Sequence, residues 1–290
     1  MSPSAVSTVL LLLFLIFVDE ASLNPHMHEN SYDDDYNGCQ GEREKEIRER
    51  YLNYELSKNK NLSSGWNESI KHWHSRNRSG LDNYTALAVR AYTTNKFYSE
   101  LNNAVQSGVD SVTKKYYRSM HFLLTKAIQT LKGRNCIRVY RGVKVEIRPK
   151  VKDAFRFGRF ASTSTNITVA RRFGKGTFFS IKTCHGADIS KYSVYQNESE
   201  VLIPPYEEFI VTQVKGKDVT LASKKVTVYK RCAPLPEPRK TLAFMKGYAQ
   251  RRSAGLTWKR ARPIARAKSK VPAKGKVNAF LHFSNSNRLI

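Results

Sequence analysis

The chain has 290 residues and a formal net charge of +26 at pH 7. This length suits one domain of ordinary size with a hydrophobic core, plus a tail. The apolar run at residues 9–18 is too short for a membrane span and has the length of a signal peptide, so we expect residues 1–22 to be a signal peptide that is removed.

Four cysteines follow this segment: Cys39, Cys136, Cys184 and Cys232. An even number in a secreted chain predicts two disulfides, and the spacing leaves all three pairings open. A zinc site is the alternative, but none of the cysteines lies in a C-x-x-C or C-x-x-H arrangement. A secretory route also agrees with six N-x-S/T sequons, at Asn61, Asn67, Asn77, Asn83, Asn166 and Asn197.

Helical patterns dominate the chain up to Gly133. Apolar residues at helical intervals predict a partly exposed helix over residues 41–58, which we expect to end in a break at residues 59–65. Three further helices are predicted at residues 84–93, 97–105 and 116–131. The last has the longest apolar stripe, and Gly133 follows it as a stop signal.

Short β-rich segments follow these helices. They lie at residues 137–141, 157–164, 177–182, 200–203, 209–214, 219–221 and 226–229. Helices first and strands later predict an α+β fold with an antiparallel or mixed sheet.

A proline-rich linker at residues 233–238 leads into a basic tail. Residues 239–290 contain fourteen Lys or Arg and no Asp or Glu. The tail has no sustained apolar face, so we expect it to be disordered or weakly helical when free. Adhesion to polyanions is its expected role, and sulfated glycans are favoured because no nucleic-acid fold signature is present.

Paired carboxylates provide the first candidate site. Glu198 and Glu200 flank Ser199 directly before an apolar run. In an extended strand residues i and i+2 share a face, so the pattern predicts the two carboxylates side by side. Two such charges are costly unless a cationic ligand or an electron-poor reacting centre lies in front of them.

Two upstream segments supply further candidates. Arg141 ends an apolar strand between Tyr140 and Gly142, where a glycine would let a ligand approach and a guanidinium could bind phosphate. A surface arginine at a strand end is the alternative. Ser162 begins a run of three hydroxyls, and no His or Asp lies at a convincing spacing to make it a triad nucleophile. We therefore predict that Ser162 positions a ligand.

Taken together and in this order, the segments resemble arginine-specific mono-ADP-ribosyltransferases of the vertebrate ecto-enzyme type, in the Arg–Ser–Glu class. The similarity extends from Asp33 to about Cys232. It is carried by residues 33–39, 88–93, 97–102, 121–125, 139–142, 160–164 and 198–205.

The resemblance implies a catalytic domain at residues 23–232 and a tail at 233–290. In this family a helical N-terminal part precedes two packed, mostly antiparallel β-sheets, and NAD⁺ binds in the cleft between them as co-substrate, without a metal. The expected product is ADP-ribose attached to arginine side chains of acceptor proteins, with release of nicotinamide. The disulfides implied are Cys39–Cys232 and Cys136–Cys184.

The resemblance also implies roles for single residues. Arg141 would anchor the phosphates, Ser162 would bind the nicotinamide ribose, and Glu200 would hold its 2′-hydroxyl and stabilise an oxocarbenium-like transition state. Glu198 would bind the acceptor arginine. Phe173 is a candidate for packing on nicotinamide, and its alternative is a core anchor. Because a glycan next to these carboxylates would crowd the site, we expect the sequon at Asn197 to be unmodified in an active form.

Three other functions are alternatives for the same residues or for the tail. An NAD⁺ glycohydrolase would use the same residues with water as acceptor. A catalytically weak secreted protein that binds polyanions through its tail is disfavoured by the intact candidate residues. A glycoside hydrolase is disfavoured because its carboxylates flank the bond they cleave. The C-terminal residues 276–290 lack the apolar run of a lipid-anchor signal, so we expect a secreted chain. Nothing in the sequence demands more than a monomer.

Overall fold

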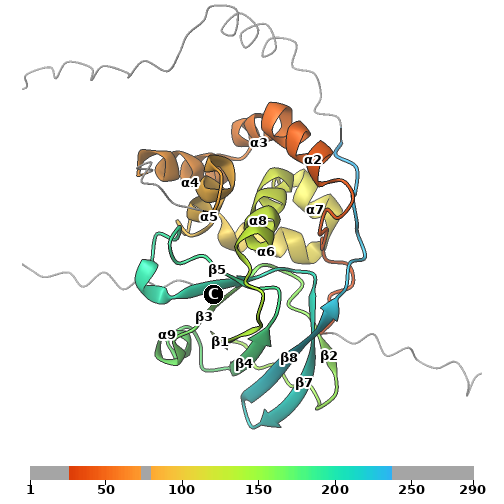
Figure 1. The fold of residues 1–290 in the computed structure, drawn as a ribbon, viewed down its shortest axis with the longest axis vertical. Helices are drawn as coiled ribbons and strands as arrows, with labels where there is room; N and C mark the ends of the chain where they lie inside the picture. The colour runs from red at the N-terminus through yellow and green to blue at the C-terminus, as the bar shows by residue number, and fades with distance from the viewer. Residues whose placement is uncertain (1–25, 73–79, 237–290) are drawn as a thin grey trace, which may run out of the picture. The chain divides into compact units, whose positions relative to one another are not determined.

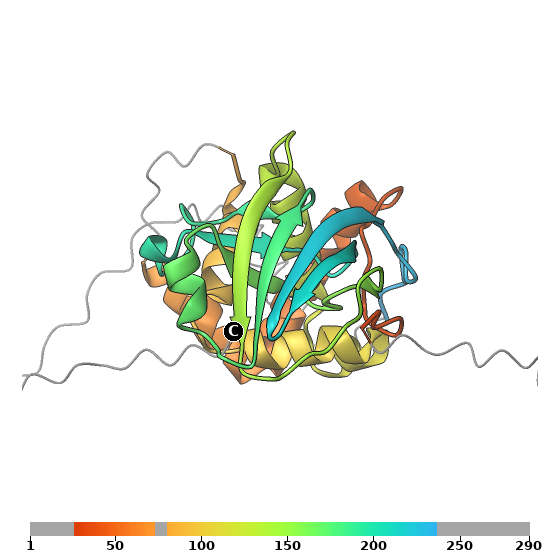
Figure 2. The same ribbon diagram turned by 90° about the horizontal axis from the view of Figure 1, so that it is seen from below.

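A computed structural model describes residues 26–72 and 80–236 (Figure 1). The expected signal peptide and the basic tail beyond residue 238 lie outside the described residues. The helical and strand segments follow one another as expected, so the α+β class is confirmed. The helices before the first strand gather on one side of the sheet (Figures 1 and 2).

The helical part has these bounds: α2 Gln40–Glu46, the π-helical turn η1 Ile47–Tyr51, α3 Leu52–Lys58, α4 Lys60–Lys71, α5 Asn83–Tyr92, α6 Tyr98–Ser107, α7 Val109–Lys114 and α8 Arg118–Leu131. The expected break is confirmed at Asn59, where α3 ends, but its extension to residue 65 is wrong. The side chain of Asn59 accepts a hydrogen bond from the backbone N–H of Leu62 and so caps a new helix, α4. Gly65 lies inside α4 because Phe97 and Thr94 occupy the space that a Cβ would take.

The strands are β1 Ile137–Val143, β2 Ala154–Phe155, β3 Ala161–Ser164, β4 Thr177–Thr183, β5 Ala187–Asp188, β6 Glu200–Ile203, β7 Glu207–Lys215 and β8 Asp218–Val226. A short helix, α9 Ile167–Arg171, follows β3. The strand order is β2-β7-β8-β4-β1-β3-β6-β5, and among these pairings only β4–β8 is parallel. The segment predicted at residues 219–221 lies inside β8, which ends at Val226, so the strand predicted at residues 226–229 is wrong apart from its first residue.

The expectation of two separate sheets needs a correction. All eight strands are hydrogen-bonded into one sheet, but β1 meets β3 through a single residue pair, Tyr140 and Ser164. This narrow junction divides the sheet into β2-β7-β8-β4-β1 and β3-β6-β5. The two parts pack on each other, because Val201 and Ile203 of β6 share a core with Phe179 of β4. The side chain of Leu202 points the other way, into the core formed with the helices.

Both disulfides that the resemblance implied are present, Cys39–Cys232 and Cys136–Cys184. The first ties the two ends of the described fold together across 193 residues of chain. Aspartates just before Cys39 reinforce this closure. Asp33 accepts hydrogen bonds from the backbone N–H groups of residues 229 and 230, and Asp34 from those of residues 232 and 233.

Candidate active site

Arg141 is directed into the fold by the alternation of β1. Arg138, three residues earlier on the same strand, is exposed, whereas Arg141 is only 8% exposed. The Nη1 of Arg141 donates a hydrogen bond of 2.5 Å to the carbonyl oxygen of Ser162, which links β1 to β3 close to the junction of the sheet. Its Nε is buried and has no hydrogen-bond partner among the described residues. Burial lowers the pKa of Arg141 to about 10, so the guanidinium stays protonated at neutral pH.

The three hydroxyls of β3 have different surroundings. Thr163 donates to the carbonyl of Val201, and Ser164 donates to the carbonyl of Glu198. These two bonds join β3 to β6 and to the turn before it. Ser162 is 5% exposed and lines the same cavities as Arg141. The structural hydroxyls are therefore Thr163 and Ser164, and Ser162 faces the candidate site.

The backbone conformation of the paired carboxylates differs from the prediction. Glu198 ends a 3₁₀ turn, Ser199 takes a left-handed conformation with φ 48°, and β6 begins only at Glu200. The two glutamates are therefore not successive residues on one face of a strand, as expected from the sequence. Glu198 is half-buried in the turn, whereas Glu200 is 2% exposed on the strand.

Glu200 lies next to the cavity by strand register. It pairs with Ser164 across β3 and β6, two residues along β3 from Ser162. The buried hydroxyl of Ser193 donates to Oε2 of Glu200 at 3.3 Å. Ser193 is thus a positioning residue that the sequence analysis missed, since a single serine in a loop carries no distinguishing signal.

One cavity brings together most of the predicted residues; its lining is Tyr140, Arg141, Gly142, Ser162, Thr163, Ser164, Ala170 and Phe173. The half-buried Phe173 follows α9, so it is a cavity residue rather than a core anchor. Gly142 lines the cavity and also has a structural role that the sequence did not indicate. A Cβ on it would lie 2.5 Å from the carbonyl oxygen of Ala170, so the glycine lets the end of α9 approach the backbone of β1.

A second cavity adjoins the first and shares Arg141 and Ser162 with it. Its full lining is Tyr92, Tyr98, Ser99, Asn102, Arg141, Arg159, Phe160 and Ser162. This cavity extends from the strands to helices α5 and α6. Arg141 and Ser162 thus line both cavities, and we refer to the two cavities together as the path.

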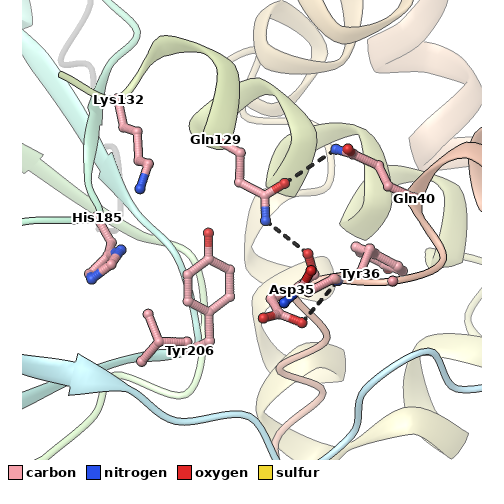
Figure 3. A pocket seen from close by; sticks show the side chains of 10 residues that line it. Asp35, Tyr36, Gln40, Gln129, Lys132, His185 and Tyr206 are labelled. Atoms are coloured by element: carbon pink, nitrogen blue, oxygen red, sulfur yellow. Dashed lines mark hydrogen bonds between the residues drawn. The ribbon is translucent and has the colours of Figure 1, made fainter. Parts of the chain in front are cut away.

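A third cavity, of about 350 Å³, lies beside the C-terminal end of α8 (Figure 3). Gln129 donates from its side-chain amide to the carbonyl of Asp35 and accepts a hydrogen bond from Gln40. Lys132, His185 and Tyr206 also line it. None of the lining residues is shared with the other two cavities, so the candidate site does not include it.

Metal ligands and membrane spans were sought over the described ranges, 26–72 and 80–236. No group of three or more His, Cys, Asp or Glu side chains in them has an arrangement that could hold a metal ion. The same part of the chain contains no helix long and apolar enough to cross a membrane.

Comparisons with known proteins agree with this arrangement. The sequence profile described as "NAD:arginine ADP-ribosyltransferase" matches residues 25–228. Ecto-ADP-ribosyltransferase 5 of Bos taurus is 37% identical over 237 residues, which cover 73% of this chain and 74% of that one. The erythroblast NAD(P)(+)--arginine ADP-ribosyltransferase of Gallus gallus is 36% identical over 64% of this chain and 66% of its own length.

Solved structures extend the similarity to the fold. The crystal structure of the eukaryotic mono-ADP-ribosyltransferase ART2.2 superposes with a TM-score of 0.66 at 31% identity, over 71% of this chain and 97% of that one. A mutant of ART2.2 in complex with NAD matches equally well, with a TM-score of 0.66 at 30% identity over 71% and 96% of the two chains. The profile match, the sequence identity and the shared fold together establish that the chain belongs to the NAD:arginine ADP-ribosyltransferase family.

Proposed function

We propose that this chain transfers ADP-ribose from NAD⁺ to arginine side chains of proteins and releases nicotinamide. The observation that carries the proposal is the meeting of Arg141 and Ser162 in one cavity, with Glu200 paired in register beside them. The ART2.2 complex with NAD supports NAD⁺ as the co-substrate. We assign the activity to residues 23–232 and treat residues 233–290 as a separate tail.

The residues divide the reaction between donor and acceptor. Arg141 binds the phosphates of NAD⁺, Ser162 binds the nicotinamide ribose, and Phe173 packs on the nicotinamide ring. Tyr140 and Gly142 complete the lining. As the glycosidic C–N bond breaks, nicotinamide leaves with the bonding electron pair and C1′ of the ribose becomes electron-poor. A fixed carboxylate at Glu200 stabilises that charge where it develops.

Glu198 acts on the acceptor. A guanidinium is a poor nucleophile because its pKa exceeds 12. A carboxylate that accepts hydrogen bonds from it orients one nitrogen toward C1′ and favours loss of the proton as the new C–N bond forms. The position of Glu198 outside β6, in the turn before it, separates it from the strand that carries Glu200. These separate positions support a role for Glu200 with the donor NAD⁺ and a role for Glu198 with the acceptor arginine.

The first test is transfer to agmatine by the Glu198→Gln variant. We expect loss of ADP-ribosyl-agmatine by about tenfold or more, while nicotinamide release continues with water as acceptor. Labelled NAD⁺ and chromatography of the products measure both. The exposed Glu49→Gln variant is the control and should match the wild type. Free ADP-ribose without any adduct from the wild type would identify a glycohydrolase, and equal loss of both products in Glu198→Gln would contradict the division of roles.

We further propose that the chain acts as a monomer outside the cell. Two disulfides form and persist in oxidising compartments. The sequon asparagines in the described residues are exposed, as glycan attachment requires; they are Asn61, Asn67, Asn83, Asn166 and Asn197. Several relatives are named ecto-enzymes, which also supports an extracellular location.

The basic tail is proposed to bind sulfated glycans. Replacing five tail arginines by glutamine in the full chain should lower the salt concentration that elutes it from heparin, because fewer counterions are released on binding. The replaced residues are Arg251, Arg252, Arg260, Arg262 and Arg266. The matched control replaces five exposed cations of the folded part, at Arg138, Lys144, Lys152, Lys182 and Lys217. An equal or larger decrease in the control would show that the tail has no special part in binding.

A further inference from the structure

A second arginine faces the path on which Arg141 lies. Arg159 lines the cavity that extends toward α5 and α6, together with Arg141 and Ser162. Burial lowers the pKa of Arg159, and the charge of Arg159 also lowers the pKa of Arg141. No carboxylate among the described residues forms a salt bridge with either guanidinium. Arg141 is buried and Arg159 is half-buried, and the charge of Glu200 offsets only part of the effect on Arg141. Two such cations that face one cavity are costly unless an anion occupies it.

The guanidinium of Arg159 is held in place from behind. Its Nη2 donates a hydrogen bond to the side-chain oxygen of Gln106 on α6. The amide nitrogen of Gln106 is in turn hydrogen-bonded to Nδ1 of His28 at 2.9 Å. The backbone before Arg159 is also constrained, because Gly158 has φ +61° and a Cβ on it would overlap the side chain of His28. The residue is therefore oriented by its surroundings and is not a loose surface cation.

The helical wall of the cavity also favours an anion. Tyr98 and Ser99, in the first turn of the ten-residue helix α6, line it. No side chain caps this helix at Phe97, so its first N–H groups and its dipole add positive potential. Glu100 in the same turn is held elsewhere, by a hydrogen bond from the hydroxyl of Tyr117.

A buried acceptor completes this wall. Asn102 is 7% exposed and lines the cavity, and its Oδ1 has no hydrogen-bond partner in the described part of the chain. Its amide nitrogen donates to the hydroxyl of Tyr92 at 2.9 Å, which leaves the oxygen as acceptor. An acceptor beside two guanidinium groups suits a ligand that carries a hydroxyl next to its phosphates.

We propose that Arg159 is a second phosphate-binding residue of the NAD⁺ site. Arg141 lines both cavities and takes the nicotinamide-side phosphate. Arg159 lines only the second cavity, which extends to α5 and α6, and takes the adenosine-side phosphate. Asn102 then accepts a hydrogen bond from a hydroxyl of the adenosine ribose. This assignment rests on the proposed function, because it requires the dinucleotide as substrate.

The test is the steady-state kinetics of Arg159→Gln with NAD⁺ and agmatine. Loss of a charged hydrogen bond should raise KM for NAD⁺ about tenfold to a hundredfold. The value of kcat should stay within about threefold, because the phosphates make the same contacts in the ground and transition states. Arg138→Gln is the matched control, since it removes the same charge from an exposed position of β1. Equal KM values in the two variants would overturn the proposal.

Competition by AMP tests which phosphate Arg159 binds. AMP carries only the adenosine-side phosphate, so Arg159→Gln should weaken inhibition by AMP about tenfold or more relative to Arg138→Gln. Unchanged inhibition by AMP would overturn the assignment. Arg159→Lys keeps a charge at the site and should show a smaller rise in KM, and thermal unfolding reports whether each variant folds. If the wild type itself transfers nothing to agmatine, the proposed function fails; if it does and only Arg159→Gln behaves like the control, this inference alone fails.

Discussion

The Glu200→Gln variant is expected to lose ADP-ribosyl transfer by about 10²–10⁴-fold in kcat. The substitution keeps the size of the side chain but removes the negative charge that faces C1′ in the transition state. KM for NAD⁺ should change little, because the charge at C1′ develops mainly in the transition state. In contrast to Glu198→Gln, this variant should lose nicotinamide release equally whether water or agmatine is the acceptor of ADP-ribose. Release of labelled nicotinamide under saturating NAD⁺ measures the effect.

The control for Glu200 is a second buried glutamate outside the cavities. Glu208 on β7 is 3% exposed and forms a salt bridge with Lys224 at 3.0 Å. Glu208→Gln makes the same chemical change at the same burial, so it should retain kcat. A comparable loss of kcat in both variants would indicate a general effect of removing a buried carboxylate and would contradict the role of Glu200.

Ordered motifs in the sequence identified several residues that line one cavity in the structure. Arg141, Ser162 and Phe173 meet in one cavity because β1, β3 and the turn after α9 converge at the narrow junction of the sheet. The disulfide pairs also followed from the resemblance. The alternation of β1 was readable as well, since it buries Val139 and Arg141 and exposes Arg138.

Local backbone geometry was the part that could not be predicted. A left-handed serine at position 199 has no signal in its residue type, because this conformation is expected of glycine or asparagine. The strand predicted at residues 200–203 is confirmed, but the expectation that Glu198 and Glu200 share one face of an extended strand was wrong. Gly142 was identified, but its neighbour is the end of α9, which only the tertiary structure brings there. Arg159 was missed for a similar reason, since its partner Gln106 is 53 residues away in the chain.

The turn at Ser199 removes one reason against a glycoside hydrolase, because Glu198 and Glu200 do not lie on one face of a strand. Family membership and Arg141 still disfavour that function. Arg141 is a buried guanidinium that lines both cavities, and binding of a neutral sugar would not require it.

The second large effect is expected in stability, from the Asp33→Asn variant. Asp33 and Arg156 form a salt bridge of 2.7 Å, and both side chains are fully buried. Removing the negative charge would leave the Arg156 cation uncompensated, at a cost of about 3–5 kcal/mol in the free energy of unfolding. It would also weaken the hydrogen bonds from the backbone of residues 229 and 230, which close the fold beside Cys39–Cys232. Urea unfolding with the disulfides intact measures the change.

The same acidic run contains the control. Asp35 lies two residues further on and forms a salt bridge of 3.1 Å with Arg231; the arginine side chain is 52% exposed and that of Asp35 12%. Asp35→Asn removes an equal charge but leaves a cation that water can solvate, so it should cost less than about 1 kcal/mol. The double variant Asp33→Asn/Arg156→Met removes both buried charges and keeps a side-chain oxygen for the backbone N–H groups of residues 229 and 230. It should be more stable than Asp33→Asn, since an unpaired buried cation costs more than its absence. Equal destabilisation by Asp33→Asn and Asp35→Asn would contradict this account, because burial is the property that separates the two pairs.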